Sequence, residues 1–182
     1  MVKMRKKSQM EIIGLVIIVI LIALGMLFMA QFALKGDPKK KIFVRKGLAY
    51  STMGALMKTD ILCKDYGLSS KIDTKYLAIG EKLVDDCAGS FADTSRSTFM
   101  CDNQHSCVFL GETVADLLNQ TLGKWNKHYE FKSNLVYGTK VILLVNVTDS
   151  SGKGCPGERD TSGLFPFNTP SGIVENVLYV CD

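Results

Sequence analysis

The chain has 182 residues, with 22 Lys and Arg against 18 Asp and Glu and a formal net charge of +4. Four of these cations, Lys3, Arg5, Lys6 and Lys7, lie in the first eight residues, so residues 9–182 carry 18 cations against 18 carboxylates. Nothing in this balance indicates the basic face that nucleic-acid binding requires, and we expect no nucleic acid as a partner. The length predicts one apolar helix followed by one domain of about 140 residues, which is large enough for a hydrophobic core.

Residues 9–34 are expected to form a membrane-spanning helix. The segment contains 19 consecutive uncharged residues from Ile12 to Ala30, and the uncharged run continues to Leu34. As an α-helix this run would span roughly 28 to 35 Å, compared with about 30 Å for the hydrocarbon core of a bilayer. Because the run is apolar on every face, it must lie in lipid or in a sheath of similar helices.

The residues before this helix carry a second signal. A basic leader, residues 1–8, ends at the small residue Ser8, and Gln9 and then Glu11 follow at the start of the apolar run. This pattern resembles the class III (prepilin-type) signal segment of archaeal type IV pilins and pseudopilins. The resemblance implies that a prepilin peptidase cuts the Ser8–Gln9 bond at the cytoplasmic face. The family places its Glu at the fifth mature position, whereas Glu11 would be the third.

Residues 35–46 form a basic juxtamembrane collar, which is typical of contact with lipid headgroups. Both flanks of the apolar run are therefore basic, and the positive-inside rule does not orient it. All six cysteines follow the helix, and an even number in a small domain favours an oxidising compartment. The sequence therefore predicts a cytoplasmic N-terminus and an extracellular head domain, residues 47–182.

In the first half of the head, hydrophobic spacing predicts two helices. One is expected over residues 45–60, after a break at Gly36-Asp37-Pro38, and whether it continues the first helix stays open. A turn at residues 63–70 then leads to a second helix, capped by Asp73 and ending near Asp86.

A polar loop over residues 90–103 precedes the most clearly amphipathic segment of the head, residues 107–126. Its apolar positions recur at helical spacing and include Trp125, which we expect to pack in the core. The adjacent carboxylates Asp85 and Asp86 are interpreted as a solvated helix end.

The last third of the chain changes to the two-residue period of a strand. Alternation around Tyr129 and Phe131, a β-branched run over 140–147 and a closing segment over 173–181 predict antiparallel strands, with a long loop over 149–171. An antiparallel sheet of three or four strands packed on about two to three helices gives an α+β fold class. A hydrophobic spine helix followed by such a head resembles the type IV pilin architecture.

The six cysteines are expected to form three disulfides. A zinc site over residues 101–107 is disfavoured, because zinc needs four ligands and no second Cys/His pair lies nearby in the sequence; His105 would then be an exposed loop residue. We favour the pairs Cys63–Cys87, Cys101–Cys107 and Cys155–Cys181, one of fifteen possible connectivities. The last pair resembles the disulfide-bounded C-terminal loop of many bacterial type IV pilins.

Two sequons, Asn119-Gln120-Thr121 and Asn146-Val147-Thr148, make Asn119 and Asn146 candidate glycosylation sites. For catalysis the chain offers only two histidines, His105 and His128, and it contains no GxSxG, HExxH or glycine-rich phosphate motif. We therefore expect no enzymatic activity, no catalytic residues, no metal and no cofactor.

Two functions are compatible with these patterns. The resemblance implies a structural subunit of a pilus-like surface filament, or a minor pseudopilin, which assembles through its N-terminal helix with copies of itself or with related pilins. Glu11 would then pair with the new α-amino group of Gln9 on a neighbouring subunit, because an unpaired carboxylate among apolar helices costs several kcal/mol. The alternative is an uncleaved, single-pass membrane protein whose disulfide-bonded ectodomain binds a ligand or another cell.

Overall fold

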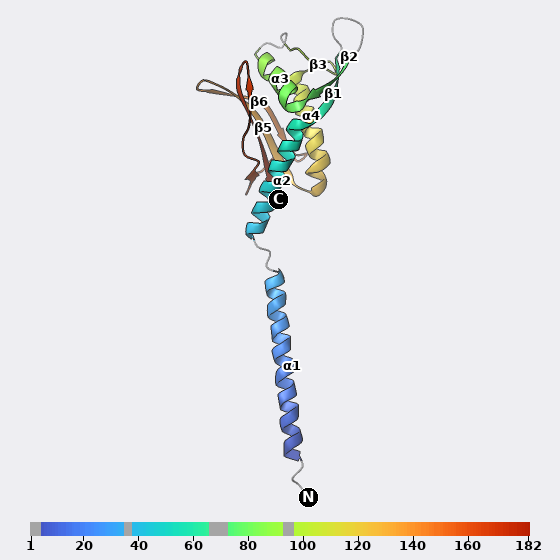
Figure 1. Ribbon diagram of the computed structural model, residues 1–182, viewed down its shortest axis with the longest axis vertical. Coiled ribbons are helices and arrows are strands. Elements are labelled where there is room, and N and C mark those ends of the chain that lie inside the picture. Colours follow the sequence, from blue (N-terminus) through green and yellow to red (C-terminus); the bar gives the residue numbers. More distant parts are fainter. Residues whose placement is uncertain (1–4, 35–37, 66–72, 93–96) are drawn as a thin grey trace. The chain divides into compact units, whose positions relative to one another are not determined.

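The computed structural model describes residues 5–34, 38–65, 73–92 and 97–182. The chain divides into two compact units, Met1–Lys41 and Ile42–Asp182. The first unit contains the apolar helix α1 (Arg5–Leu34), and most of α2 (Pro38–Lys58) belongs to the second (Figure 1). Proline suits the first position of α2, because its fixed φ is already helical and no N–H is needed there.

The second unit, which we call the head, combines short helices with antiparallel strands. In chain order its elements after α2 are β1 (Asp60–Asp65), β2 (Asp73–Ala78), the π-helical turn η1 (Ile79–Leu83), α3 (Val84–Ser90), β3 (Met100–Cys101), β4 (Gln104–His105), α4 (Ser106–Thr121), the 3₁₀ turn η3 (Gly123–Trp125), β5 (His128–Tyr137), β6 (Lys140–Thr148), β7 (Asp160–Thr161), β8 (Phe165–Thr169) and β9 (Gly172–Cys181). The predicted α+β class is therefore confirmed.

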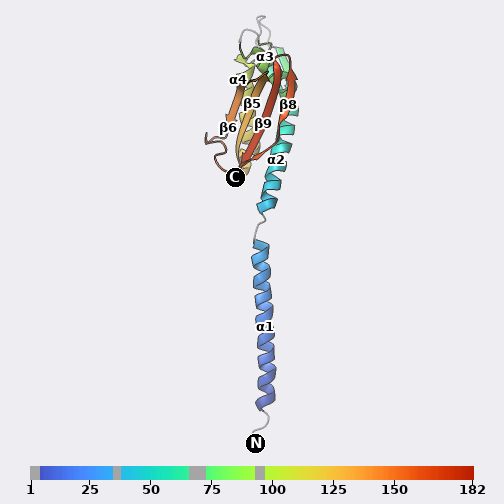
Figure 2. The ribbon, with the colours of Figure 1, turned by 90° about the vertical axis from the view of Figure 1, so that its left-hand side faces the viewer.

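The strands form two antiparallel sheets. The small sheet has the order β2-β1-β3-β4, and the large sheet has the order β6-β5-β9-β7, with β8 also paired to β9. Helices α2 and α4 lie against one face of the large sheet (Figures 1 and 2). Their buried side chains meet those of the sheet in one core, to which Met53, Leu110 and Phe131 contribute large, fully buried side chains.

The strands of the large sheet follow the predicted alternation. In β5 every second residue from Tyr129 to Leu135 is buried, and in β9 Val174 and Leu178 face the same core. β5 and β6 are joined by a two-residue turn at Gly138-Thr139, where Gly138 has a φ of +59°. The predicted strands at 129–131, 140–147 and 173–181 are therefore confirmed. They could be predicted because burial of one face of a strand gives its sequence a two-residue period.

The long predicted loop over 149–171 is only partly correct. It contains two short strands, β7 and β8, which pair along the same edge of β9. The sequence prediction missed them because β7 has two residues and β8 contains Pro166, which is tolerated only at a sheet edge. As a result the large sheet has five strands rather than three or four.

The predicted helix over residues 73–86 is wrong in its first half. Residues 73–78 form β2, which pairs residue by residue with β1, and Leu77 is buried opposite Ile61. Helical structure starts only at Ile79, in η1, and continues in α3 to Ser90. Short apolar patterns fit either period, and here the tertiary pairing with β1 decides the outcome.

Helix α4 is confirmed, but the expected burial of Trp125 is wrong. Leu110, Val114 and Leu118 of α4 are buried, as the spacing predicts. The α-helix ends at Thr121, and the tighter η3 turn changes the direction of the side chains after it. Leu122 is therefore buried, while 61% of Trp125 is exposed.

Candidate functional site

Helix α1 has the length and composition of a membrane span. Its most apolar stretch, Gly14–Gln31, has 18 residues and would cover about 27 Å as a helix. All residues of this stretch are exposed in the structure. Ser8, Gln9 and Glu11 belong to the same helix, but their side chains lie outside the described part of the structure. By its length and composition, α1 is a candidate membrane anchor or signal helix.

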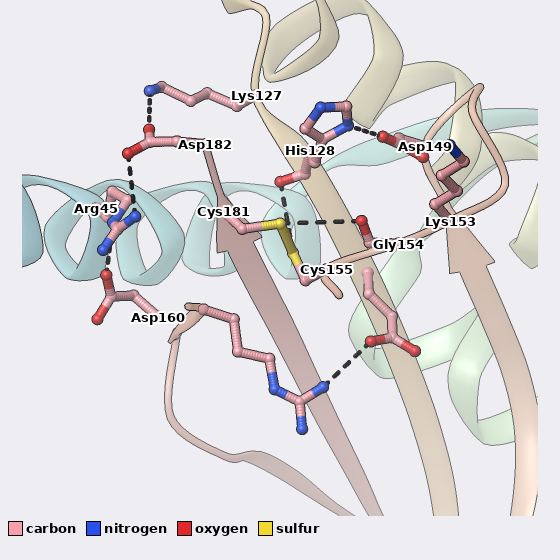
Figure 3. Close-up of a disulfide and its surroundings, with 12 residues drawn as sticks. Arg45, Lys127, His128, Asp149, Lys153, Gly154, Cys155, Asp160, Cys181 and Asp182 are labelled. Atoms are coloured by element: carbon pink, nitrogen blue, oxygen red, sulfur yellow. Dashed lines mark hydrogen bonds and ion pairs between the residues drawn. A yellow bond between two sulfur atoms is a disulfide. The ribbon is translucent and has the colours of Figure 1, made fainter. Parts of the chain in front are cut away.

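Arg45 is the charged centre of the head. The sequence placed it in the basic collar, but it is buried, with only 8% exposed. Its Nε donates to the buried Asp160 of β7 at 2.7 Å, and its Nη1 donates to Asp182 at 3.0 Å (Figure 3). Lys127 pairs with the second carboxylate oxygen of Asp182. Arg45 therefore ties the start of α2 to the strands and loop that end the chain.

The Cys155–Cys181 disulfide lies beside this ion cluster (Figure 3). An open pocket of about 460 Å³ adjoins the disulfide, and side chains of both charges line it. Its lining includes Arg45, His128, Lys153, Glu158, Cys181 and Asp182. The predicted pairing of these two cysteines is confirmed. The disulfide holds the loop after β6 against the last residue of β9, and so it shapes the pocket.

The imidazole of His128 and the carboxylate of Asp149 are hydrogen-bonded at the edge of this pocket (Figure 3). About half of the His128 side chain is exposed, whereas Asp149 is buried. Burial acts to raise the pKa of Asp149, but hydrogen bonds from Ser151 and His128 outweigh it, and the net pKa is lowered. The Ser151 hydroxyl donates to Asp149 and not to the imidazole, so the group orients His128 without forming a serine nucleophile and base.

Neither cluster was predicted from the sequence. Arg45 and Asp160 are 115 residues apart, and no local pattern links them. His128 and Asp149 could have been found, because a hairpin that turns at Gly138-Thr139 brings the start of β5 next to the end of β6.

Asp86 is not the solvated helix end that the sequence suggested. It is buried and accepts hydrogen bonds from Ser97 Oγ at 2.8 Å and from the backbone N–H of Thr98 at 2.7 Å and Phe99 at 3.4 Å. Burial acts to raise its pKa, but these hydrogen bonds lower it overall. The carboxylate thus organises the chain between α3 and β3.

His105 is not an exposed loop residue either. It is the N-cap of α4, and its Nδ1 accepts a hydrogen bond from the backbone N–H of Cys107 at 3.2 Å. The side chain is partly buried, because β4 places it at the junction between the small sheet and α4.

All six cysteines form disulfides, as predicted, but two predicted pairs are wrong. The structure pairs Cys63 with Cys101 and Cys87 with Cys107. Strand β1 pairs with β3, which brings Cys63 next to Cys101, and α3 lies against α4, which brings Cys87 next to Cys107. Sequence proximity favoured the wrong partners because the sheet pairing of residues 60–65 was not recognised.

The two predicted glycosylation sites lie on different elements. Asn119 is exposed on α4, and Asn146 is exposed on β6. In the part of the chain that the structure describes, no three His, Cys, Asp or Glu side chains gather as a metal site would require.

The head thus presents a buried ion cluster, a pocket beside a disulfide and two sequons with exposed asparagines. Among the described residues, one helix is long and apolar enough to cross a membrane. Comparison of the chain with protein-family models, with curated proteins and with solved structures finds no match.

Proposed function

We propose that the chain is a structural subunit of a type IV pilus-like surface filament, in which the N-terminal helices of many copies pack together. Three features support this proposal. They are the basic leader that ends at Ser8-Gln9, the apolar helix α1 with no polar face, and a head closed by three disulfides. The head lies outside the cell, where disulfides persist.

The observation that carries the proposal is the exposed apolar surface at the start of α2 in the head. Ile42, Phe43 and Val44 are exposed by 38%, 78% and 57%. Successive helical residues are about 100° apart, so these three cover roughly 200° of the helix surface. Arg45, the next residue, faces the head instead.

A simple membrane anchor needs only that its apolar helix cross the bilayer, and it does not require apolar side chains at 42–44 in addition to the basic collar. A filament subunit does, because the helix beyond the membrane segment must pack against neighbouring copies. Exposed apolar clusters on soluble domains mark such contact surfaces. The cluster of Ile42, Phe43 and Val44 therefore favours assembly over anchoring alone.

The test compares Phe43→Ser with Lys46→Ser, an exposed position on the same helix. We expect Phe43→Ser to lower the ratio of protein in sheared extracellular material to protein in membranes. Lys46→Ser should leave this ratio unchanged, and both variants should reach normal total levels. Equal ratios for wild type and Phe43→Ser, with filaments still abundant, would contradict the proposed role of this surface.

A second candidate is an uncleaved surface protein that binds a ligand, and the pocket beside Cys155–Cys181 is what favours it. In this case the leader remains on the chain and no variant yields sheared protein. The pocket then provides the binding surface, with Lys153 and Glu158 at its wall.

A further inference from the structure

The two sequons differ in how their side chains are held. Asn119 lies in the last turns of α4, and its Oδ1 accepts a hydrogen bond from the Tyr129 hydroxyl at 2.8 Å. The Thr121 hydroxyl donates to the carbonyl of Leu117, also at 2.8 Å. The first and last residues of this sequon are therefore engaged within the helix and its packing.

Asn146 lies in an extended strand and is exposed. Its neighbours Val145 and Val147 are buried, so the side chain of Asn146 points away from the core. Its partner across the ladder is Lys132 of β5. The side-chain amide of Asn146 therefore points to solvent from an extended strand.

The other face of β6, toward α4, borders a hollow. An open hollow of about 460 Å³ lies between α4 and β6, and Asn146 is one of its lining residues. Val108, which is 52% exposed, and Leu144 provide apolar surface in this hollow.

Strand β6 needs protection. It is the outermost strand on its side of the large sheet in the described part of the chain. It has nine residues, exposes 66% of Val141 and 50% of Leu143, and has Lys140 at its first position as its only charged residue. Long apolar edges of this kind pair with other chains unless a charge, a bulge or a cover prevents it. In β6 these protections are limited to Lys140 at one end and one irregularity, where Leu144 has no partner in β5.

We propose that Asn146 carries an N-linked oligosaccharide that shields the edge of β6, and that Asn119 remains unmodified. The inference rests on the extracellular location of the head in the proposed function. The amide nitrogen of Asn146 forms a bond to the anomeric carbon of an oligosaccharide held on a lipid phosphate. The bond between that carbon and the phosphate oxygen breaks, the lipid phosphate leaves, and the amide loses one proton.

Peptide mapping of the full chain from its own cells tests the site. Trypsin places Asn146 in the peptide 141–153 and Asn119 in the peptide 97–124. We expect 141–153 to carry added sugar mass on Asn146 and 97–124 to carry none. Sugar on Asn119, or an unmodified Asn146, would overturn the proposal.

Alkylation of free thiols in the same sample shows whether only the glycan proposal fails or whether the extracellular location of the head fails as well. An unmodified Asn146 in a chain with all six cysteines oxidised overturns the glycan alone. An unmodified Asn146 together with free thiols also overturns the extracellular location of the head.

Matched variants test the sequon and its purpose. Thr148→Ser keeps the sequon and should retain the sugar, whereas Thr148→Ala should lose it. Asn146→Gln and Asn146→Lys both lose the sugar, but only the lysine places a charge on the edge strand. We expect light scattering of the detergent-solubilised chain to show association for Asn146→Gln and its absence for Asn146→Lys. Equal association of wild type and Asn146→Gln would overturn the shielding role.

Discussion

At the scale of single residues, the head depends on buried charges that the composition does not reveal. Arg45 belongs to a run of cations in the sequence, yet the fold removes it from water and pairs it with Asp160. A buried ion pair contributes little net stability, but removal of one partner leaves an uncompensated charge. Such pairs therefore define which arrangement of α2 and the C-terminal strands is allowed.

Arg45→Met should reduce the free energy of unfolding by about 3–5 kcal/mol, because Asp160 is then buried without a cation. The double variant Arg45→Met/Asp160→Leu should recover much of this loss. Urea unfolding of the detergent-solubilised chain, followed by near-UV circular dichroism, measures both. Lys46→Met is the matched control and should remain within about 0.5 kcal/mol of wild type; a comparable loss in this control would contradict the role of Arg45.

Asp86 makes the head sensitive to acid. Its pKa in the folded state is below the ordinary value of 3.8, so its contribution is fully present above that value and is lost as the pH falls through the lowered pKa. Asp86→Asn should cost about 1–3 kcal/mol at pH 7, because an amide cannot accept from all three donors. This difference from wild type should shrink below pH 3.8. Asp85→Asn, one residue away, should show neither effect in the same unfolding series.

At the scale of elements, the sequence correctly predicted the segments that are long enough to show a clear hydrophobic period and that bury one face. Helix α4 and strands β5, β6 and β9 meet both conditions. The segment at 73–78 does not, because it has six residues and its strand structure depends on pairing with β1. The unrecognised pairing of β1 with β3 likewise explains the wrong partner for Cys63, and the packing of α3 on α4 explains that for Cys87.

The disulfide pattern is therefore a prediction that peptide mapping can decide. With the pairs seen in the structure, unreduced tryptic peptides 59–64 and 83–96 are both linked to 97–124. The pairing favoured from the sequence would link 59–64 to 83–96 and leave 97–124 on its own. The second pattern would contradict the arrangement of β1, β3 and α3.

Removal of either disulfide should be costly. In the chain-entropy model, loops closed over 20 and 38 residues each contribute about 3–4 kcal/mol. The double variant Cys87→Ala/Cys107→Ala should lose about this much stability in urea, while its partner pair Cys63–Cys101 stays oxidised. Wild-type stability in this variant would show that the bond adds nothing to the packing of α3 on α4.

At the scale of the whole molecule, the sequence identified the apolar helix and the disulfide-rich head, because hydropathy and cysteine counts need no knowledge of contacts. The contact between Arg45 and Asp160 and the pocket beside Cys155–Cys181 could not be predicted from the sequence, because both depend on residues far apart in the chain. The sequence also predicted Trp125 in the core, where the end of α4 instead leaves it exposed. The exposure of residues 42–44 could not be predicted either, because it depends on the orientation of α2, in which Arg45 faces the head.

The proposed filament depends most directly on the start of the mature chain. Mass spectrometry of the N-terminal peptide, taken from protein sheared off its own cells, measures it. We predict that this peptide begins at Gln9, because a prepilin peptidase would remove residues 1–8 before assembly. A chain that begins at Met1 and is recovered only from membranes would contradict the filament and leave an anchored surface protein in its place.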